Sequence, residues 1–224
     1  MFRRFLIILL LVVLLGLLVG GLLLVLAYRA TQRVPEFYQQ AIQTDPKTQV
    51  AASDRMLQQT AALVSDVKRK EKWHFLFTAE EMNGWLAVDL PKNHAKALPP
   101  DLRDPRVSIT PGELTIACQA QRGGIKTVLS LTVEAYVDEP NVVAIRLKKA
   151  RAGVLPLPLN DVLDQFSAAA RRAQVPVQWR QIDGDPVALI RLPPPRDAKD
   201  RVIRIEELRL EKDEIYVAGT TTRR

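Results

Sequence analysis

The segment IKTVLSLTVEAYV, residues 125–137, alternates apolar and polar side chains over most of its length. A period of two indicates a β-strand with one dry face and one wet face. The same alternation occurs before it, in residues 114–120, and after it, in residues 143–147. Residues 121–124 and 138–142 separate the three segments, and they contain the turn sequences Gly123-Gly124 and Glu139-Pro140-Asn141. We therefore expect an antiparallel meander at the centre of the chain.

The dry face of this meander needs a cover, and residues 159–174 provide one. Their apolar side chains follow helical spacing, with Asn160 as the expected N-cap. Small residues in this helix either leave room beside it or allow close packing: Ala168, Ala169, Ala170 and Ala173. More strands are expected at residues 175–181, 187–192, 203–210 and 215–217. A bulge is expected at Glu206-Glu207, where the apolar side chains change from odd to even positions.

The folded domain is expected to begin near Trp73. Thr78 and Glu81 form a capping box before a short amphipathic helix that Pro91 is expected to end. Residues 73–224 thus predict one α+β domain, in which a curved antiparallel sheet wraps an amphipathic helix.

Residues 29–72 have a polar, helical pattern with a break in the middle. A short helix is expected from Val34 to Gln43, and a second from Asp45, an N-cap followed by Pro46. The apolar stripe of the second helix is too short for a sustained coiled coil. We expect a helical stalk that docks partly on the domain.

Residues 1–28 are expected to form a transmembrane anchor. The stretch 5–27 has 23 uncharged residues, of which 20 are apolar and three are glycine. At 1.5 Å per residue it extends about 35 Å, which exceeds a hydrocarbon core of about 30 Å. It is too long for a cleaved signal peptide and lacks a small-x-small site. Arg3 and Arg4 favour a single-pass protein in the cell membrane with a cytoplasmic N-terminus and an extracytoplasmic domain.

Two smaller features concern this anchor and the sheet. Gly16 and Gly20 have the G-x-x-x-G spacing that pairs membrane helices, although glycine is also common in unpaired ones, so a homodimer is the less expected alternative. Cys118 is the single cysteine and shares a strand face with Leu114 and Ile116. We expect it to be a buried apolar residue and not a reactive thiol.

The order of these motifs resembles the YpmS-like family of uncharacterised, membrane-anchored bacterial envelope proteins. The resemblance is carried by FTAEEMNGWL at residues 77–86, the meander, the Glu139-Pro140-Asn141 corner, GVLPLP at residues 153–158 and a last hairpin. The order of motifs is also similar to that of single-domain members of the tubular lipid-binding (TULIP) superfamily. The resemblance covers residues 73–220 and implies a curved sheet around a helix and an apolar groove. It implies no activity, and the stalk departs from the shorter family members.

Signatures of catalysis and metal binding are absent from the sequence. It contains no G-x-S-x-G, H-E-x-x-H, phosphate loop or dinucleotide fingerprint. His74 and His94 have no partners at a ligand spacing, and Asp183-Gly184-Asp185 lacks the ligand series of a calcium loop. We expect no enzyme activity, no metal and no cofactor.

The formal net charge of +7 favours an anionic partner. Nucleic acid is not expected, because the domain is predicted to face outward and its basic residues are not interleaved with aromatics. A membrane surface fits better, and a solvated polar face is an equal alternative. The residues expected to contact the membrane are Arg146, Lys148, Lys149, Arg151, Arg171 and Arg172.

These features predict a non-enzymatic, membrane-anchored envelope protein that binds a lipid or another apolar ligand between sheet and helix. The residues expected to line this groove are Leu129, Leu131, Val133, Val162, Leu163, Phe166 and Ala170. The alternative is a membrane-tethered scaffold for a protein partner in an envelope assembly. An open apolar groove favours the first function, and a filled core with a flat exposed patch favours the second.

Overall fold

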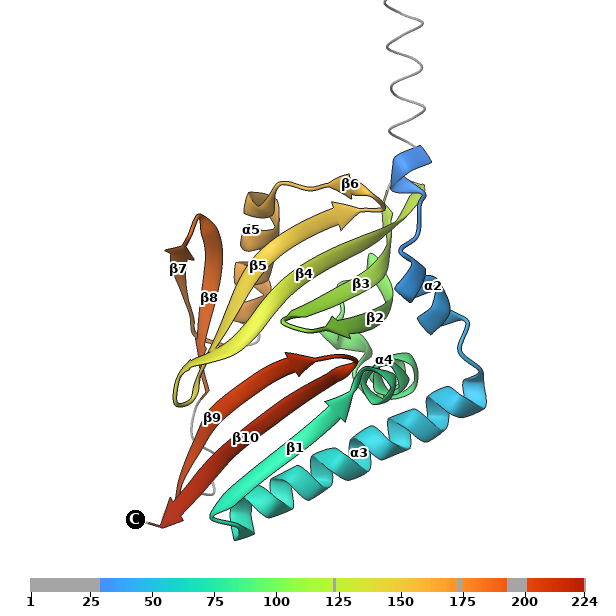
Figure 1. The fold of residues 1–224 in the computed structure, drawn as a ribbon. Coiled ribbons are helices and arrows are strands. Elements are labelled where there is room, and N and C mark those ends of the chain that lie inside the picture. Colours follow the sequence, from blue (N-terminus) through green and yellow to red (C-terminus); the bar gives the residue numbers. More distant parts are fainter. Residues whose placement is uncertain (1–28, 123, 173–174, 193–200, 224) are drawn as a thin grey trace, which may run out of the picture.

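The computed structural model describes residues 29–122, 124–172, 175–192 and 201–223 (Figure 1). These residues form an α+β fold with a large antiparallel sheet and a few helices. The predicted anchor and its Gly16 and Gly20 lie outside the described residues. Within the described ranges, no helix combines the length and the apolar character that a membrane span requires.

The large sheet contains the predicted meander. Its strands follow the order β2-β3-β4-β5-β8-β7, and the short β6 pairs with β5. The bounds are β2 (Leu102–Thr110), β3 (Glu113–Arg122), β4 (Ile125–Glu139), β5 (Val142–Ala152), β6 (Leu155–Pro156), β7 (Val177–Ile182) and β8 (Asp185–Arg191). All of these pairings are antiparallel. β3 and β4 are therefore interior strands, and β2 is the edge strand that pairs with β3.

A second, three-stranded sheet lies at the end of the molecule away from residue 29 (Figure 1). It consists of β1 (Lys72–Thr78), β10 (Glu214–Arg223) and β9 (Arg201–Glu211), in that order. The expectation of a single sheet was wrong here, and β1 was missed. The bulge was predicted correctly: Ala218 pairs with Glu207 and Gly219 with Ile205, which leaves Glu206 as the extra residue.

The helices are α2 (Glu36–Ile42), α3 (Pro46–Arg69), α4 (Ala79–Asn93), the 3-10 turn η1 (Ala95–Ala97) and α5 (Leu159–Arg172). The starts of α3 and α4 agree with the sequence prediction. The other two α-helices differ: α2 begins at Glu36 and not at Val34, and α5 begins at Leu159, so Asn160 lies inside that helix and is not its N-cap. The Asp45 carboxylate accepts hydrogen bonds from the amides of Lys47 and Thr48. Thr78 and Glu81 form both bonds of the capping box. Pro91 does not end α4, which continues to Asn93. A proline this close to the C-terminus of a helix removes only one hydrogen bond, so the last turn can still form.

The segment between the predicted anchor and the domain packs along the domain. α3 lies against α4, where a Cβ added to Gly84 would be 2.6 Å from the Cβ of Ala52. Only glycine permits this approach of the two helices. α2 lies beside β2 and contributes the buried Tyr38 to a cluster with Ala117 and Val128. Residues 29–72 thus form part of the packed structure.

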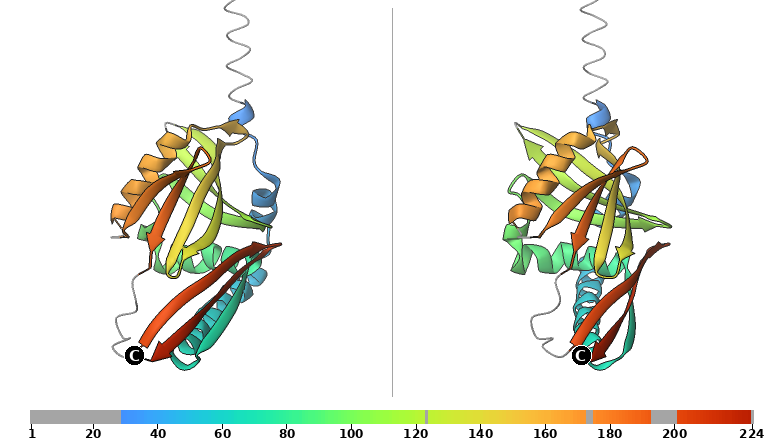
Figure 2. Two further views of the ribbon diagram at one scale, coloured as in Figure 1. Left: turned by 60° about the vertical axis from the view of Figure 1, so that its left-hand side comes forward. Right: turned by 90° about the vertical axis from the view of Figure 1, so that its left-hand side faces the viewer.

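α2 and α5 lie on opposite sides of the large sheet (Figure 2). We call the side toward α5 the inner face and the side toward α2 the outer face. The indole Nε1 of Trp179 on β7 donates to Ser167 Oγ of α5 at 3.0 Å, and strand pairing aligns Trp179 with Ala188, Ile145 and Ala135 on the inner face. Farther down this face, Ile109, Leu114 and Ala135 pack with Ala79 and Leu210, which joins the two sheets.

Candidate functional site

The neighbouring interior strands β3 and β4 have an incompletely covered inner face. Pairing aligns Ile116 with Leu131 and Cys118 with Leu129 on this face. Ile116 is 39% exposed, and the other three side chains are half-buried. Apolar side chains at the middle of a sheet are normally its best covered part, because packing there removes most surface from water. We call these four residues the open row.

The cover over the inner face ends before it reaches the open row. On the α5 side, Leu147, Ala150 and Ala188 are buried. Val133 is also buried, opposite Leu114 and Leu147, and it marks the closed end of the row. Leu129 and Leu131 of the predicted groove therefore lie in the open row, while Val133 belongs to the core.

α5 supplies the predicted residues from the other side. Its Val162, Leu163 and Ala170 are half-buried, and the Phe166 side chain lies outside what the structure describes. Few residues of α5 approach β5. The structure thus places the helix and the open row on the same side of the sheet, with the helix concentrated over β5 and β7.

Cys118 reports on the chemistry of the open row. Its thiol is the single sulfhydryl of the chain, and burial raises its pKa from 9.0 to about 11. An apolar neighbourhood disfavours the thiolate, so the thiol is a weak nucleophile at neutral pH. The immediate surroundings of this thiol are therefore poorly solvated.

The outer face of the same strands is closed over Ala117 and Val128. Ala117 is 0% exposed and packs with Tyr38 and Val128, with Phe37 against them. The Tyr38 hydroxyl donates to the carbonyl of Asp104 at 2.9 Å. Burial, and then the charge of Asp104, raises the pKa of Tyr38 to about 12. A tyrosine from a helix before the domain thus seals one face of β3.

The predicted membrane-contact residues Arg146 and Lys148 lie in an ion network on the outer face. Arg146 Nη2 is 2.9 Å from Asp183 Oδ2, and Lys148 Nζ is 3.1 Å from Asp185 Oδ2. Both cations also approach Glu134, at 3.6 and 3.5 Å. The hydrogen bonds to Asp183 and Asp185 raise the pKa of Arg146 and of Lys148. These two cations link β4 and β5 to the β7–β8 turn.

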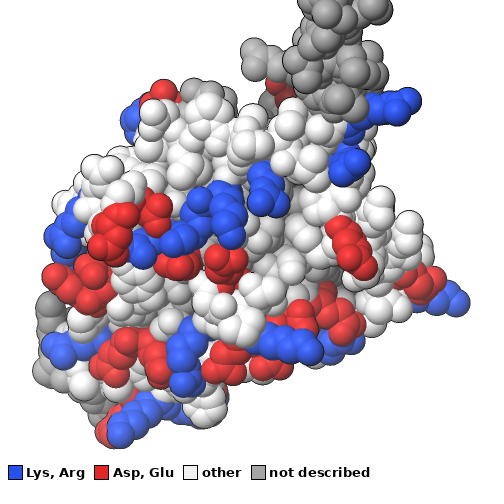
Figure 3. Space-filling model, turned by 45° about the horizontal axis from the view of Figure 1, so that its top comes forward, with Lys and Arg blue, Asp and Glu red and all other residues white. Residues whose placement is uncertain are grey.

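The other predicted cations are divided between the two faces. Lys149 and Arg151 are exposed on the outer side of β5, with Lys149 Nζ 4.0 Å from Glu113. Arg171 is exposed on α5, and the Arg172 side chain lies outside the described residues. Figure 3 shows a row of basic side chains that leads across this side of the molecule, with acidic side chains beside it.

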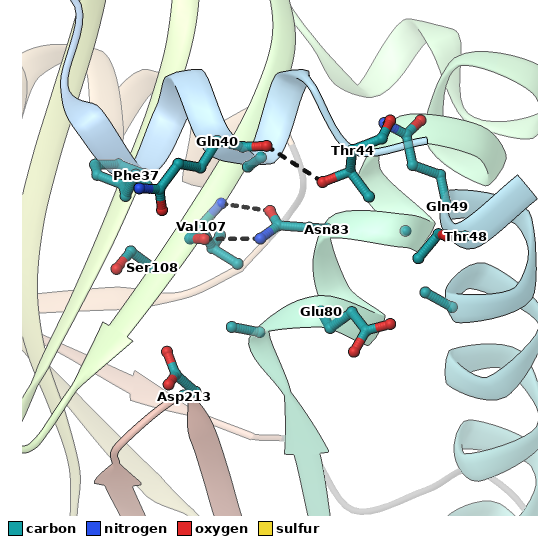
Figure 4. Close-up of a pocket in the computed structure, with 14 residues that line it drawn as sticks. Phe37, Gln40, Thr44, Thr48, Gln49, Glu80, Asn83, Val107, Ser108 and Asp213 are labelled. Carbon is teal, nitrogen blue, oxygen red and sulfur yellow. Dashed lines mark hydrogen bonds between the residues drawn. The ribbon is translucent and has the colours of Figure 1, made fainter. Parts of the chain in front are cut away.

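A cavity of about 330 Å³ between α2, α3, α4 and β2 was not expected from the sequence (Figure 4). Its polar groups serve packing: the Asn83 amide donates to the carbonyl of Val107 and accepts from its N–H, at 2.9 and 2.8 Å. Glu80 accepts from Arg55 at 2.8 Å. Asn83 thus replaces a neighbouring strand at the edge of β2.

Metal-binding geometry does not occur within the described part of the chain, where no three His, Cys, Asp or Glu side chains gather. His94 lies 3.5 Å from Asp89, and the ring of His74 stacks on Tyr216. The turn at Asp183-Gly184-Asp185 joins β7 to β8, as a hairpin turn was expected to do.

Ile116 is the site residue that sequence reasoning missed, because alternation placed it in a covered core. The width of a helix is the signal that could have indicated its exposure. A helix about 10 Å wide covers about two strands spaced 4.8 Å apart, so one helix cannot close a six-strand path.

No profile of a protein family matches this chain, and no curated protein is significantly similar to it.

Proposed function

We propose that this protein is a non-enzymatic, single-pass membrane protein whose outward-facing domain binds an apolar chain, such as a lipid acyl chain. The ligand lies along the open row and beside α5. The observation that carries the proposal is the exposure of Ile116 on an interior strand of the sheet. The next residue, Ala117, faces the other side of the same strand and is completely buried, so the strand is uncovered on its inner face only. The resemblance to YpmS-like and TULIP proteins supports the same arrangement.

The chemistry of the site suits an acyl chain and not a polar ligand. Ile116, Leu129 and Leu131 offer hydrocarbon surface, and the raised pKa of Cys118 indicates poor solvation. Each buried methylene contributes about 0.8 kcal/mol, so ten contribute about 8 kcal/mol before the cost of ordering the chain. Because no charged side chain is needed for this gain, the site selects for chain length more than for head group.

A membrane-tethered scaffold is the second candidate function. Val50, Leu57 and Val64 recur at seven-residue intervals on α3, and all three are exposed. Such a stripe is the surface that a partner helix contacts. Its short length and the polar residues between its members favour the lipid proposal as the leading one.

Native mass spectrometry of the detergent-purified full-length protein tests both functions. We expect lipid to co-purify with the natural chain and with Leu57→Glu. We expect the amount that co-purifies with Ile116→Glu to be at least tenfold lower. The two variants carry the same charge change on exposed apolar residues and keep the same anchor, so lipid around the anchor cancels. Equal lipid in Ile116→Glu and the natural chain contradicts the proposal. Loss of a co-purifying protein in Leu57→Glu alone supports the scaffold.

A further inference from the structure

Residues 30–32 are bound to one end of the large sheet. The Thr127 hydroxyl donates to the carbonyl of Thr31 at 2.7 Å, and the Gln32 amide donates to the carbonyl of Lys126 at 2.8 Å. The amide of Val154 donates to the carbonyl of Ala30 at 3.1 Å. The first described residues therefore run beside the start of β4 and the loop after β5.

Gly153 makes this attachment possible. Its φ is +59°, and an added Cβ would be 2.4 Å from the carbonyl oxygen of Ala30. Both the backbone conformation and the close approach exclude other residues. The loop at residues 153–158 is thus built to hold the segment that precedes the domain.

The attachment fixes the distance between this loop and the bilayer. The apolar run of the predicted anchor ends at Ala27, three residues before Ala30. Three residues reach at most about 10 Å when extended. Any bilayer that holds residues 5–27 therefore lies next to Gly153 and Val154.

The loop presents apolar side chains at this position. Residues 153–158, GVLPLP, carry no charge, and Val154 and Leu157 are 45% and 36% exposed. Exposed basic residues lie close to them along the chain or beside the attached residues 30–32: Arg29, Arg33, Lys126 and Arg151. An apolar tip flanked by basic residues is the pattern of segments that enter the interface of an anionic membrane.

We infer that residues 153–158 dock into the head-group region of the bilayer that holds the anchor, with Val154 and Leu157 inserted and Arg151 at the lipid phosphates. This docking rests on the predicted anchor and not on lipid binding by the open row. It deepens the proposed function, because it places the Leu129 end of the open row at the membrane, where a lipid chain can enter. Cys118 and Leu129 pair at that end, next to Ala152 and the loop.

Fluorescence quenching on the full-length chain in lipid nanodiscs tests the inference. In a Cys118→Ser background, single cysteines replace Val154, Leu157 or Val64, and each carries an environment-sensitive dye. Val64 is the matched control, an exposed valine on α3. Nitroxide-labelled phospholipids are expected to quench the dye at positions 154 and 157 several-fold more than at 64. Equal quenching at all three positions overturns the inference.

Two further variants separate docking from lipid binding. Arg151→Glu is expected to reduce quenching at position 154 more strongly in phosphatidylglycerol discs than in phosphatidylcholine discs, because only the first carry a net negative charge. Ile116→Glu is expected to leave that quenching unchanged. If Ile116→Glu abolishes it, docking depends on the open row, and the inference of an independent docking surface is wrong.

Discussion

The two faces of β3 differ in how the chain covers them. On the outer face, Ala117 is sealed under Tyr38 of α2, which precedes the domain by more than thirty residues. On the inner face, Ile116 is left open, because α5 lies over β5 and β7. Of two neighbouring residues of one strand, one is therefore buried and the other is exposed to solvent.

This difference separates two roles of apolar surface in one sheet. The outer face uses small side chains and one aromatic cap, and it stabilises the fold. The inner face has larger side chains that the chain itself leaves in contact with solvent. Large uncovered aliphatic residues in the interior of a sheet cost stability unless another molecule covers them. The comparison therefore predicts which substitutions unfold the protein and which only weaken binding of the proposed ligand.

The largest expected effect is on the outer face. Ala117→Glu places an unpaired carboxylate under Tyr38 and is expected to lower the free energy of unfolding by about 4 kcal/mol or more. Ile116→Glu is the matched change on the inner face and is expected to cost about 1 kcal/mol or less, as partly exposed positions do. Urea unfolding followed by tryptophan fluorescence measures both. Equal losses would show that the two faces are equally closed.

Removal of the two covers is expected to give the next largest difference. Tyr38→Ala opens a cavity over Ala117 and Val128 and is expected to cost about 3 kcal/mol. Leu163→Ala on α5 is expected to cost about 1 kcal/mol, because the side chain is only half-buried. The same urea titrations test this pair. A larger loss for Leu163→Ala would show that α5 fills the inner face.

High pH is expected to weaken both faces. Burial raises the pKa of Cys118 to about 11 and that of Tyr38 to about 12, so the folded state holds these protons more tightly than the unfolded state. Unfolding therefore releases protons, and the stability falls as pH rises from about 9 to about 12. Cys118→Ala is expected to flatten the part between pH 9 and 11. The stability of Cys118→Ala and of the natural chain, measured by urea at each pH, checks this.

The smallest effect is expected in the ion network. Lys148→Met removes a cation whose pKa the Asp185 hydrogen bond raises, at a site where solvent screens the charges. We expect a small change in global stability and faster amide exchange in the β7–β8 turn. Hydrogen exchange with mass spectrometry distinguishes this turn from β3. Faster exchange in β3 as well would contradict the local role of the network.

Local patterns predicted most of the elements, and distant packing determined how they assemble. The alternation in residues 114–147 identified β3, β4 and β5, and the side chains of Asp45 and Thr78 marked the starts of α3 and α4. Even the bulge at Glu206 followed from a change of phase in the apolar positions. These features depend on neighbours in the sequence, which the sequence displays directly.

The second sheet and the open row depend on distant contacts. β1 pairs with β10 across more than 130 residues, and Trp73 Nε1 donates to Thr221 there. No local pattern links these segments. Likewise, alternation identifies Ile116 as facing the inner side but not whether anything covers it. The exposure of Ile116 depends on where α5 settles, which the spacing of its own apolar residues does not determine.

Photo-crosslinking tests the central claim most directly. The full-length protein is placed in nanodiscs whose phospholipids carry a diazirine on the acyl chain, and the modified peptides are mapped by mass spectrometry. We predict adducts in residues 114–118 and 129–131, in addition to those expected in residues 5–27, and their loss in Ile116→Glu. Adducts confined to residues 5–27 and 153–158 would contradict an apolar ligand on the inner face.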